Sequence, residues 1–139
     1  MSTLNVTNAQ ITTLKDASGG NSSIPADVFE GRAKAWLHFN GVGTPAIVDN
    51  FNITSITDNA AADYTVNFAS ALANANYCIV TGNGSLASGS GHAHITLNRV
   101  NATGTHVDPT TGAFRLTCAD AVGTTTENKF IYAAVFCGA

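Results

Sequence analysis

The chain of 139 residues is long enough for one domain with an ordinary apolar core, without help from disulfides or metal ions. Charged residues make up only 11% and the formal net charge is −3, so we expect a polar surface that is mostly uncharged. Lys and Arg together number six and are scattered singly, which excludes the basic stripe that a nucleic-acid partner would require.

The first ten residues, MSTLNVTNAQ, lack the positive region and the apolar stretch of a secretory signal. No later run approaches the roughly eighteen apolar residues of a membrane span, so we expect no membrane insertion. We expect the protein to stay in the cytoplasm where it is made, or to leave by lysis. Cys78, Cys118 and Cys137 each lie in an apolar, strand-like run with no CxxC spacing, which predicts buried free thiols.

Residues 1–31 differ from the rest and are predicted to form an N-terminal anchoring arm. The apolar residues expected to anchor it to another chain are Leu4, Val6, Ile11 and Leu14. The following DASGGNSS is a linker that resists regular structure, and IPADVFEGR predicts a short helix with Pro25 in its first turn and Gly31 at its end. Because the arm has too few apolar groups to bury a core, we expect another chain to order it.

From residue 32 to residue 139, apolar residues recur with a period of two, which is typical of β-strands. Clusters of Gly, Asn, Asp and Thr interrupt the pattern about every ten residues. The pattern predicts one all-β domain, a jelly-roll-like β-sandwich of about eight short antiparallel strands. The expected strands are 34–41, 45–51, 51–57, 63–68, 77–82, 93–100, 112–119 and 128–138.

Three of these strands allow finer predictions. In FNITSIT the apolar parity changes between Ile53 and Ile56, which a β-bulge would explain by inserting one residue. His38 shares a strand face with Trp36 and is expected to be packed, with a ring nitrogen hydrogen-bonded. The last strand is apolar on both faces, so it lies centrally or turns its second face toward another subunit. The expected subunit-interface residues are Phe130, Tyr132, Ile131 and Val135.

Residues 31–80 also carry a resemblance to known proteins. The words RAKAW, FNGxGT, FNxxSITDN, DYTVNF and ANY begin at Arg32, Phe39, Phe51, Asp63 and Ala75. Together they resemble a segment of tail-fibre-like or structural virion proteins of marine and cyanobacterial tailed phages. The loop that is usually Gly-rich in that family reads DNAAAD here, which predicts a different turn, and the chain after Gly82 shows no resemblance. The resemblance brings over no catalytic residue and no cofactor.

The resemblance and the apolar last strand together lead us to expect a non-enzymatic virion protein, made in the bacterial host. The favoured form is a trimeric, fibre-like appendage whose arm binds another tail or capsid protein and whose sandwich attaches to host-surface polysaccharide. The alternatives are a capsid decoration protein that cements the phage head, and a small lectin or carbohydrate-active enzyme. The loops expected to face the host, 82–92 and 101–112, contain the candidate residues Asn83, Ser85, His92, His106 and Asp108.

Three patterns resemble chemical sites. GNGSLA, residues 82–87, fits a phosphate-binding GxGxxA turn, but SGSGHAH cannot open the helix that such a turn requires, so an exposed loop is expected. His106 and Asp108 are assigned to a turn, because no nucleophile accompanies them. His92 and His94 project from one strand face, and three such pairs about a threefold axis would suit an octahedral metal. A partly exposed histidine pair without metal is the expectation.

Overall fold

The computed structural model describes residues 12–15, 18, 22–23, 25–86, 94–97, 106–120 and 123–138 of the chain. The chain divides into two compact units, residues 1–32 and 33–139. Among the described residues, no helix combines the length and the apolar composition needed to cross a membrane.

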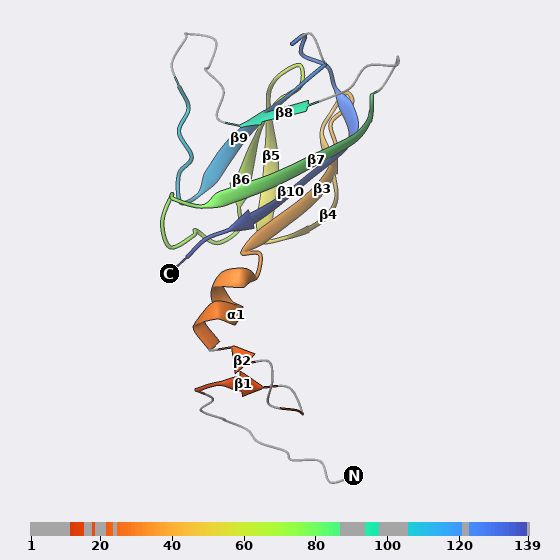
Figure 1. The fold of residues 1–139 in the computed structure, drawn as a ribbon. Helices are drawn as coiled ribbons and strands as arrows, with labels where there is room; N and C mark the ends of the chain where they lie inside the picture. Colours follow the sequence, from red (N-terminus) through yellow and green to blue (C-terminus); the bar gives the residue numbers. More distant parts are fainter. Residues whose placement is uncertain are drawn as a thin grey trace. The chain divides into compact units, whose positions relative to one another are not determined.

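Within the described residues, the first unit contains two short strands and one helix (Figure 1). Strands β1 (Leu14–Lys15) and β2 (Ser22–Ser23) pair antiparallel, and α1 spans Pro25–Gly31. The helix confirms the prediction for IPADVFEGR, with proline at its start and glycine at its end. The prediction that the linker lacks regular structure is wrong at its last two residues, because a ladder of backbone hydrogen bonds does not depend on side-chain type.

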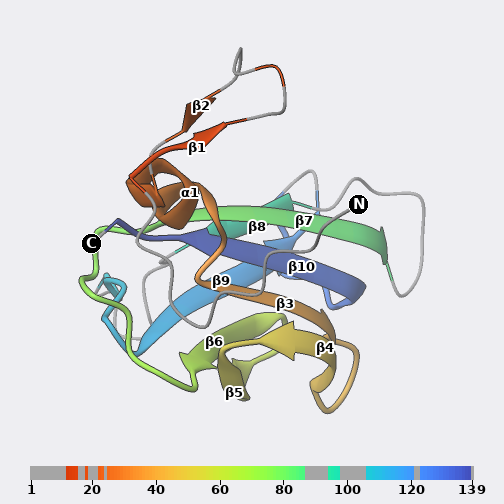
Figure 2. The same cartoon turned by 90° about the horizontal axis from the view of Figure 1, so that it is seen from below.

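The second unit is a sandwich of two four-stranded antiparallel sheets, with the orders β4-β3-β10-β7 and β5-β6-β9-β8 (Figures 1 and 2). This confirms the predicted all-β sandwich. In each sheet an early strand pairs centrally with a late one, β3 with β10 and β6 with β9. The strands are β3 (Ala35–Asn40), β4 (Ala46–Phe51), β5 (Ile53–Ala60), β6 (Asp63–Phe68), β7 (Cys78–Leu86), β8 (His94–Leu97), β9 (Ala113–Ala119) and β10 (Asn128–Phe136).

Alternate residues of the strands fill the space between the two sheets, as the period of two predicts. Phe39 and Tyr64 meet edge to face across this space, with ring centroids 5.2 Å apart. Phe68 packs against Phe114 at 5.8 Å. Each such side chain contributes about 1.5–3 kcal/mol when it is fully buried. The core cluster is formed by Ala35, Leu37, Phe39, Ile53, Ala62, Tyr64, Val66, Phe68, Leu72, Phe114, Leu116, Cys118, Ile131, Ala133, Val135 and Cys137.

The hydroxyl group of Tyr64 fixes one end of this core. It donates a 2.6 Å hydrogen bond to the carbonyl oxygen of Gly41, and burial raises the pKa of Tyr64 above its ordinary value. A Cβ atom on Gly41 would lie 2.7 Å from this hydroxyl oxygen and 2.8 Å from Cδ1 of Ile131. Both distances are too short for real atoms, so the close approach of the tyrosine requires glycine at position 41.

The chain passes from one sheet to the other through a single residue, Asn52, between the last residue of β4 and the first of β5. Asn52 has a φ of 57°, a left-handed conformation that asparagine tolerates. Its side chain accepts from the Ser70 backbone N–H at 2.8 Å and donates to the carbonyl oxygens of Lys34 and Ser70. The register then shifts between Ile53 and Ser55, which confirms the predicted bulge.

The turn between β5 and β6 uses alanine where the chain needs a left-handed residue. Ala62 has a φ of 60°, which glycine adopts more readily. Its methyl group is fully buried in the core cluster, so the burial offsets part of the backbone strain.

Strand β7 is longer than predicted. The loop expected from Gly82 onward is wrong over its first five residues, because the strand continues to Leu86 and pairs with β10. Gly84 lies opposite Phe130, and a Cβ atom on Gly84 would touch the Phe130 side chain at 3.4 Å. The aromatic side chain thus covers a glycine that would otherwise weaken the strand. The GxGxxA motif therefore lies mostly within a strand and does not form a phosphate-binding turn.

We expect Gly41→Ala to destabilise the sandwich by about 1–3 kcal/mol, because the added methyl group overlaps the Tyr64 hydroxyl and Ile131. Urea unfolding monitored by circular dichroism measures the change. The matched control is Gly112→Ala, whose Cβ would have its nearest neighbour at 3.9 Å and whose effect should stay within about 0.5 kcal/mol. Equal effects of the two variants would contradict the close-approach explanation.

Candidate functional site

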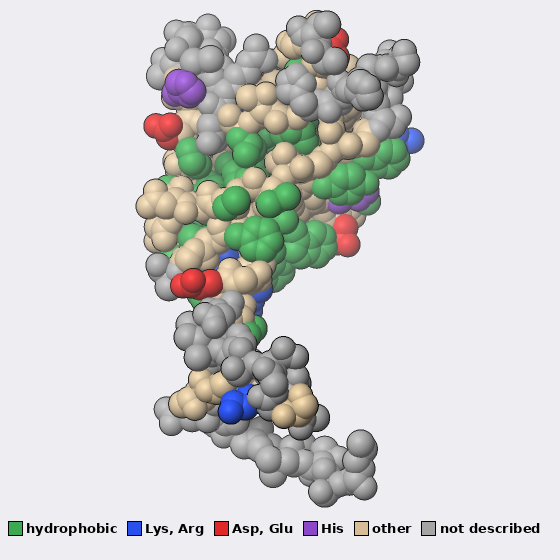
Figure 3. All heavy atoms as spheres, in the orientation of Figure 1, with side chains coloured by type: hydrophobic (Ala, Val, Ile, Leu, Met, Phe, Trp, Pro, Cys, Tyr) green, Lys and Arg blue, Asp and Glu red, His purple; other side chains and the backbone are tan. Residues whose placement is uncertain are grey.

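The outer face of the sheet β4-β3-β10-β7 carries exposed apolar side chains from all four strands. Five of them define what we call the aromatic face: Trp36, Phe51, Val80, Phe130 and Tyr132. They are between 36% and 57% exposed. In the strand register, Trp36 lies beside Phe51 on one side and Ala134 on the other, and Ala134 lies beside Val80. A continuous apolar row therefore crosses the whole sheet, and Figure 3 shows hydrophobic atoms gathered over it.

His38 lies in the next row of the aromatic face. Its ring stacks on Tyr132 with centroids 4.5 Å apart, which confirms the predicted packing. Its Nε2 atom is buried and has no hydrogen-bond partner among the described residues, which the sequence did not predict. In the register, Asp49 is the β4 neighbour of His38. A buried, unpartnered nitrogen on an otherwise apolar face marks a surface whose polar groups are incompletely satisfied.

The aromatic face is comparable in size with the largest apolar patch of a typical single chain, and such a patch is often functional. Aromatic side chains carry roughly 150–250 Å² each, so the observed exposures leave on the order of 400–500 Å² of apolar area in one patch. Lys129, whose Nζ lies 5.7 Å from the Phe130 ring centroid, and Asp49 are charged groups beside it. An apolar centre with charges at its border is typical of protein–protein contact surfaces.

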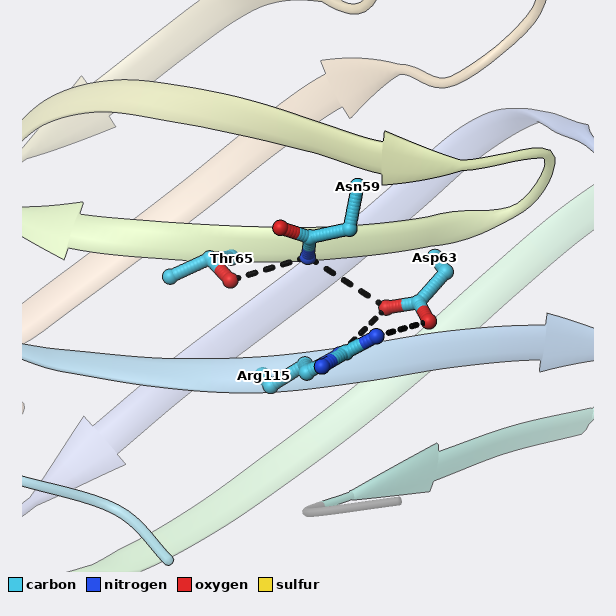
Figure 4. Close-up of polar contacts among 4 residues, drawn as sticks. All are labelled: Asn59, Asp63, Thr65 and Arg115. Carbon is cyan, nitrogen blue, oxygen red and sulfur yellow. Dashed lines mark hydrogen bonds and ion pairs between the residues drawn. The ribbon is translucent and has the colours of Figure 1, made fainter. Parts of the chain in front are cut away.

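The outer face of the other sheet is polar and centres on an ion pair. Arg115 of β9 donates from Nε to Asp63 Oδ1 at 2.6 Å and from Nη2 to the other carboxylate oxygen (Figure 4). The two side chains are only 12% and 13% exposed. The hydrogen bonds that Arg115 donates to Asp63 raise the pKa of Arg115. Asn59 donates to both Asp63 and Thr65, so a neighbouring amide also holds the carboxylate.

A second group of polar side chains continues this face. The amide nitrogen of Asn67 donates to Ser55 Oγ and Thr57 Oγ1, both at 3.1 Å. In the register, Asn67 lies beside Ser55 on β5 and beside Ala113 on β9. The polar ladder, formed by Ser55, Thr57, Thr65, Asn67 and Arg115, therefore presents fixed hydroxyl and amide groups on rigid strands.

A cavity of about 70 Å³ opens beside the polar ladder, where residues 107–110 lie against β6 and β9. Its polar lining consists of Thr65, Asp108, Thr110 and Arg115, and its apolar lining of Val107, Ala113 and Phe114. Tyr77 holds the segment 107–110 at its junction with β9. Its hydroxyl donates a hydrogen bond to the carbonyl oxygen of Ala113, at 2.9 Å, or of Thr110, at 3.0 Å. Burial raises the pKa of Tyr77 to about 12.

The structure separates the predicted subunit-interface residues into two groups. Phe130 and Tyr132 are exposed on the aromatic face, whereas Ile131 and Val135 are buried between the sheets. The assignment of Ile131 and Val135 to an interface is therefore wrong, because the pleat of β10 directs neighbouring side chains to opposite faces. Trp36, Phe51 and Val80 were not predicted, although the combination of Trp36 and His38 on the outer side of β3 was a signal for an apolar outer face.

The predicted host-facing residues have different positions. Asn83 and the backbone of Ser85 belong to β7, and the Asn83 Nδ2 atom is buried without a partner among the described residues. These two are therefore not loop residues. His106 and Asp108 are exposed in the segment before β9, and Asp108 lines the cavity. His92 lies outside the described residues.

The remaining predictions concern anchoring, metal and thiols. Leu4, Val6 and Ile11 lie outside the described residues, and Leu14 belongs to β1. His94 belongs to β8, and within the described ranges no group of three or more His, Cys, Asp or Glu residues could hold a metal ion. All three cysteines are free. Cys118 and Cys137 are buried as predicted, but Cys78 is exposed because it lies opposite Phe136 on the outer side of its sheet.

Comparison with known proteins adds no assignment: no family model, curated protein or solved structure matches the chain. The two outer faces of the sandwich are therefore the features from which a function can be inferred.

We expect Asp63→Asn to lower the free energy of unfolding by about 2 kcal/mol, because the Arg115 charge would remain largely buried without its carboxylate. Thermal or urea unfolding measures the loss. Asp58→Asn, at an exposed position on the neighbouring strand, is the control and should stay within about 0.5 kcal/mol. An Asp63→Asn variant as stable as this control would contradict a stabilising ion pair.

The raised pKa of Tyr77 predicts a loss of stability in alkali. Folding favours the neutral phenol, so this contribution is complete below the ordinary value of 10 and is lost as the pH rises through about 12. Tyr77→Phe should cost about 1 kcal/mol at neutral pH through the lost hydrogen bond, and should make stability fall less steeply between these two pH values. Urea unfolding at several pH values tests this, and an unchanged pH dependence would refute it.

Proposed function

We propose that the protein is a non-enzymatic structural protein of a phage particle, in which copies of the sandwich associate through the aromatic face. The observation that carries this proposal is the continuous row of exposed apolar side chains across four strands of a rigid sheet. Burying on the order of 400–500 Å² of apolar area would supply about half of the area that one partner gives to a standard interface.

Another protein surface fits this face better than a soluble ligand does. Val80 and Ala134 interrupt the aromatic rings with aliphatic groups, and the polar groups described in the next row are those of His38 and Asp49 and the hydroxyl of Tyr132. A sugar would require several hydrogen-bonding partners beside the rings, whereas a packed interface requires apolar area and close fit. A second copy of the chain is a partner present at high local concentration in any repetitive particle.

The number of copies and the role of the first unit belong to the same proposal. We favour a homotrimer, in which the aromatic faces pack about the symmetry axis and the polar faces of the other sheets point outward. The N-terminal unit, with few apolar residues in its sequence, would attach the trimer to another virion protein. The sandwich would then be displayed for contact with the host surface.

Sedimentation equilibrium of the full chain tests the association. We expect an oligomer that dissociates when Trp36 and Val80 are both replaced by serine, with a loss in affinity of roughly 10-fold or more per contact. Val42→Ser is the control. The Val42 side chain is likewise exposed, at 36%, but it lies outside the aromatic face, so its loss should leave the oligomer intact. A monomeric wild-type chain, or equal effects of these variants, would overturn the proposal.

The place of the protein in the particle is tested separately. Antibody labelling of purified virions should place it on the tail, and a stained gel should show a few dozen copies per particle. Near-stoichiometry with the major capsid protein would instead support a capsid decoration protein. Absence from purified particles would refute a virion role of either kind.

A further inference from the structure

We propose that the cavity beside Arg115 binds the acetamido group of an N-acetylated amino sugar. This inference rests on the proposed function, because it assigns a sugar class to the outward sheet of a host-attachment protein. Neither Asp108 nor Arg115 belongs to the aromatic face, so the two surfaces could be occupied at the same time.

The size of the cavity selects a small group. About 70 Å³ has room for a few heavy atoms, and it is far smaller than a pocket that encloses a whole ligand. A substituent of a sugar fits, whereas the ring that bears it must lie outside, against the surface. That surface is the polar ladder, where Asn67 is the strand neighbour of Ala113 and Thr65 is the neighbour of Arg115.

The inner wall of the cavity is apolar and rigid. Val107 and Ala113 contribute its apolar side chains, and Phe114 lines it from the strand while its own ring packs against Phe68 in the core. A methyl group of the ligand would gain free energy by leaving water for such a wall. The wall therefore favours a substituent that ends in a methyl group.

The polar lining offers an acceptor and a donor that match the two polar atoms of an amide. The Asp108 carboxylate only accepts hydrogen bonds and suits the amide N–H. The Arg115 guanidinium only donates and suits the amide carbonyl oxygen. Asp63 engages Arg115 through Nε and Nη2, so Nη1 is not used by that carboxylate and the guanidinium is held in one orientation.

The charges of the cavity argue against the simple ionic ligands. Asp63 and Asp108 outweigh the single positive charge of Arg115, which disfavours a phosphate, sulfate or carboxylate. An ammonium group would suit the net negative charge, but it only donates hydrogen bonds and so offers no acceptor to the Arg115 guanidinium. A neutral group with a donor, an acceptor and a methyl end satisfies every side of the cavity, and the acetamido group has all three.

Saturation-transfer NMR with the full chain tests the inference, using N,N′-diacetylchitobiose as the probe and cellobiose as its counterpart without acetamido groups. We expect the acetyl methyl protons to receive the strongest saturation, with a dissociation constant on the order of 1 mM, and cellobiose to bind at least 10-fold more weakly. Equal binding of the two sugars, or no transfer to either, would overturn the proposal.

Two variants and one control locate the binding. Asp108→Ala removes the acceptor at an exposed position and should weaken the diacetylated sugar about 10-fold. Ala113→Leu fills the cavity and should abolish the transfer. Asp49→Ala removes an exposed carboxylate on the other sheet and should change nothing. Binding that survives Asp108→Ala unchanged would exclude this cavity, even if Ala113→Leu failed to fold.

The failure of this inference is distinct from a failure of the proposed function. A chain that forms oligomers and occurs in virions but binds neither sugar would refute only the acetamido site. A monomeric chain that binds the acetylated sugar through Asp108 would refute the self-associating virion protein and would support a small lectin.

Discussion

The fold depends on the burial of alternate side chains between two sheets that face each other. Phe39, Tyr64 and Phe114 fill the middle of this layer, and every strand must present one face to it. Because a strand has only two faces, the side chains on its outer face do not contribute to the core. The two outer faces can therefore differ completely in chemistry while the sandwich between them stays the same.

The two outer faces of the sandwich differ in polarity. On one sheet the rings of Trp36 and Tyr132 contact water although nothing in the core requires them there. On the other sheet, Arg115 and Asp63 pair where an apolar side chain would also be compatible with the fold. Apolar groups gain free energy by contacting another protein, whereas fixed polar groups suit water or a hydrated ligand. The symmetric assembly that we propose would bury one face, leave the other exposed and so satisfy both preferences.

The sequence predicts local patterns well and long-range pairings poorly. The period of two located all eight strands of the sandwich, and a parity change located the bulge after Ile53. Gly82–Leu86 was missed because glycine is a turn signal within its own segment, whereas the residue that covers Gly84, Phe130, is far along the chain. Alternation showed that β10 has two apolar faces, but it did not tell which face the second sheet would cover, and Ile131 was misassigned for that reason. The contact between Asp63 and Arg115 depends in the same way on which strands become neighbours.

The corner at Asn52 has a mechanical consequence. Phe51 and Ile53 belong to different sheets, so a single left-handed residue joins the sheet of the aromatic face to the sheet of the polar ladder. Its side chain also ties this corner to the backbone at Lys34 and Ser70. At this point a force on the sheet of the polar ladder reaches the sheet of the aromatic face through a short connection that three hydrogen bonds hold, rather than through a longer loop. In the assembly that we propose, tension on the sheet of the polar ladder would reach the sheet of the aromatic face with little slack.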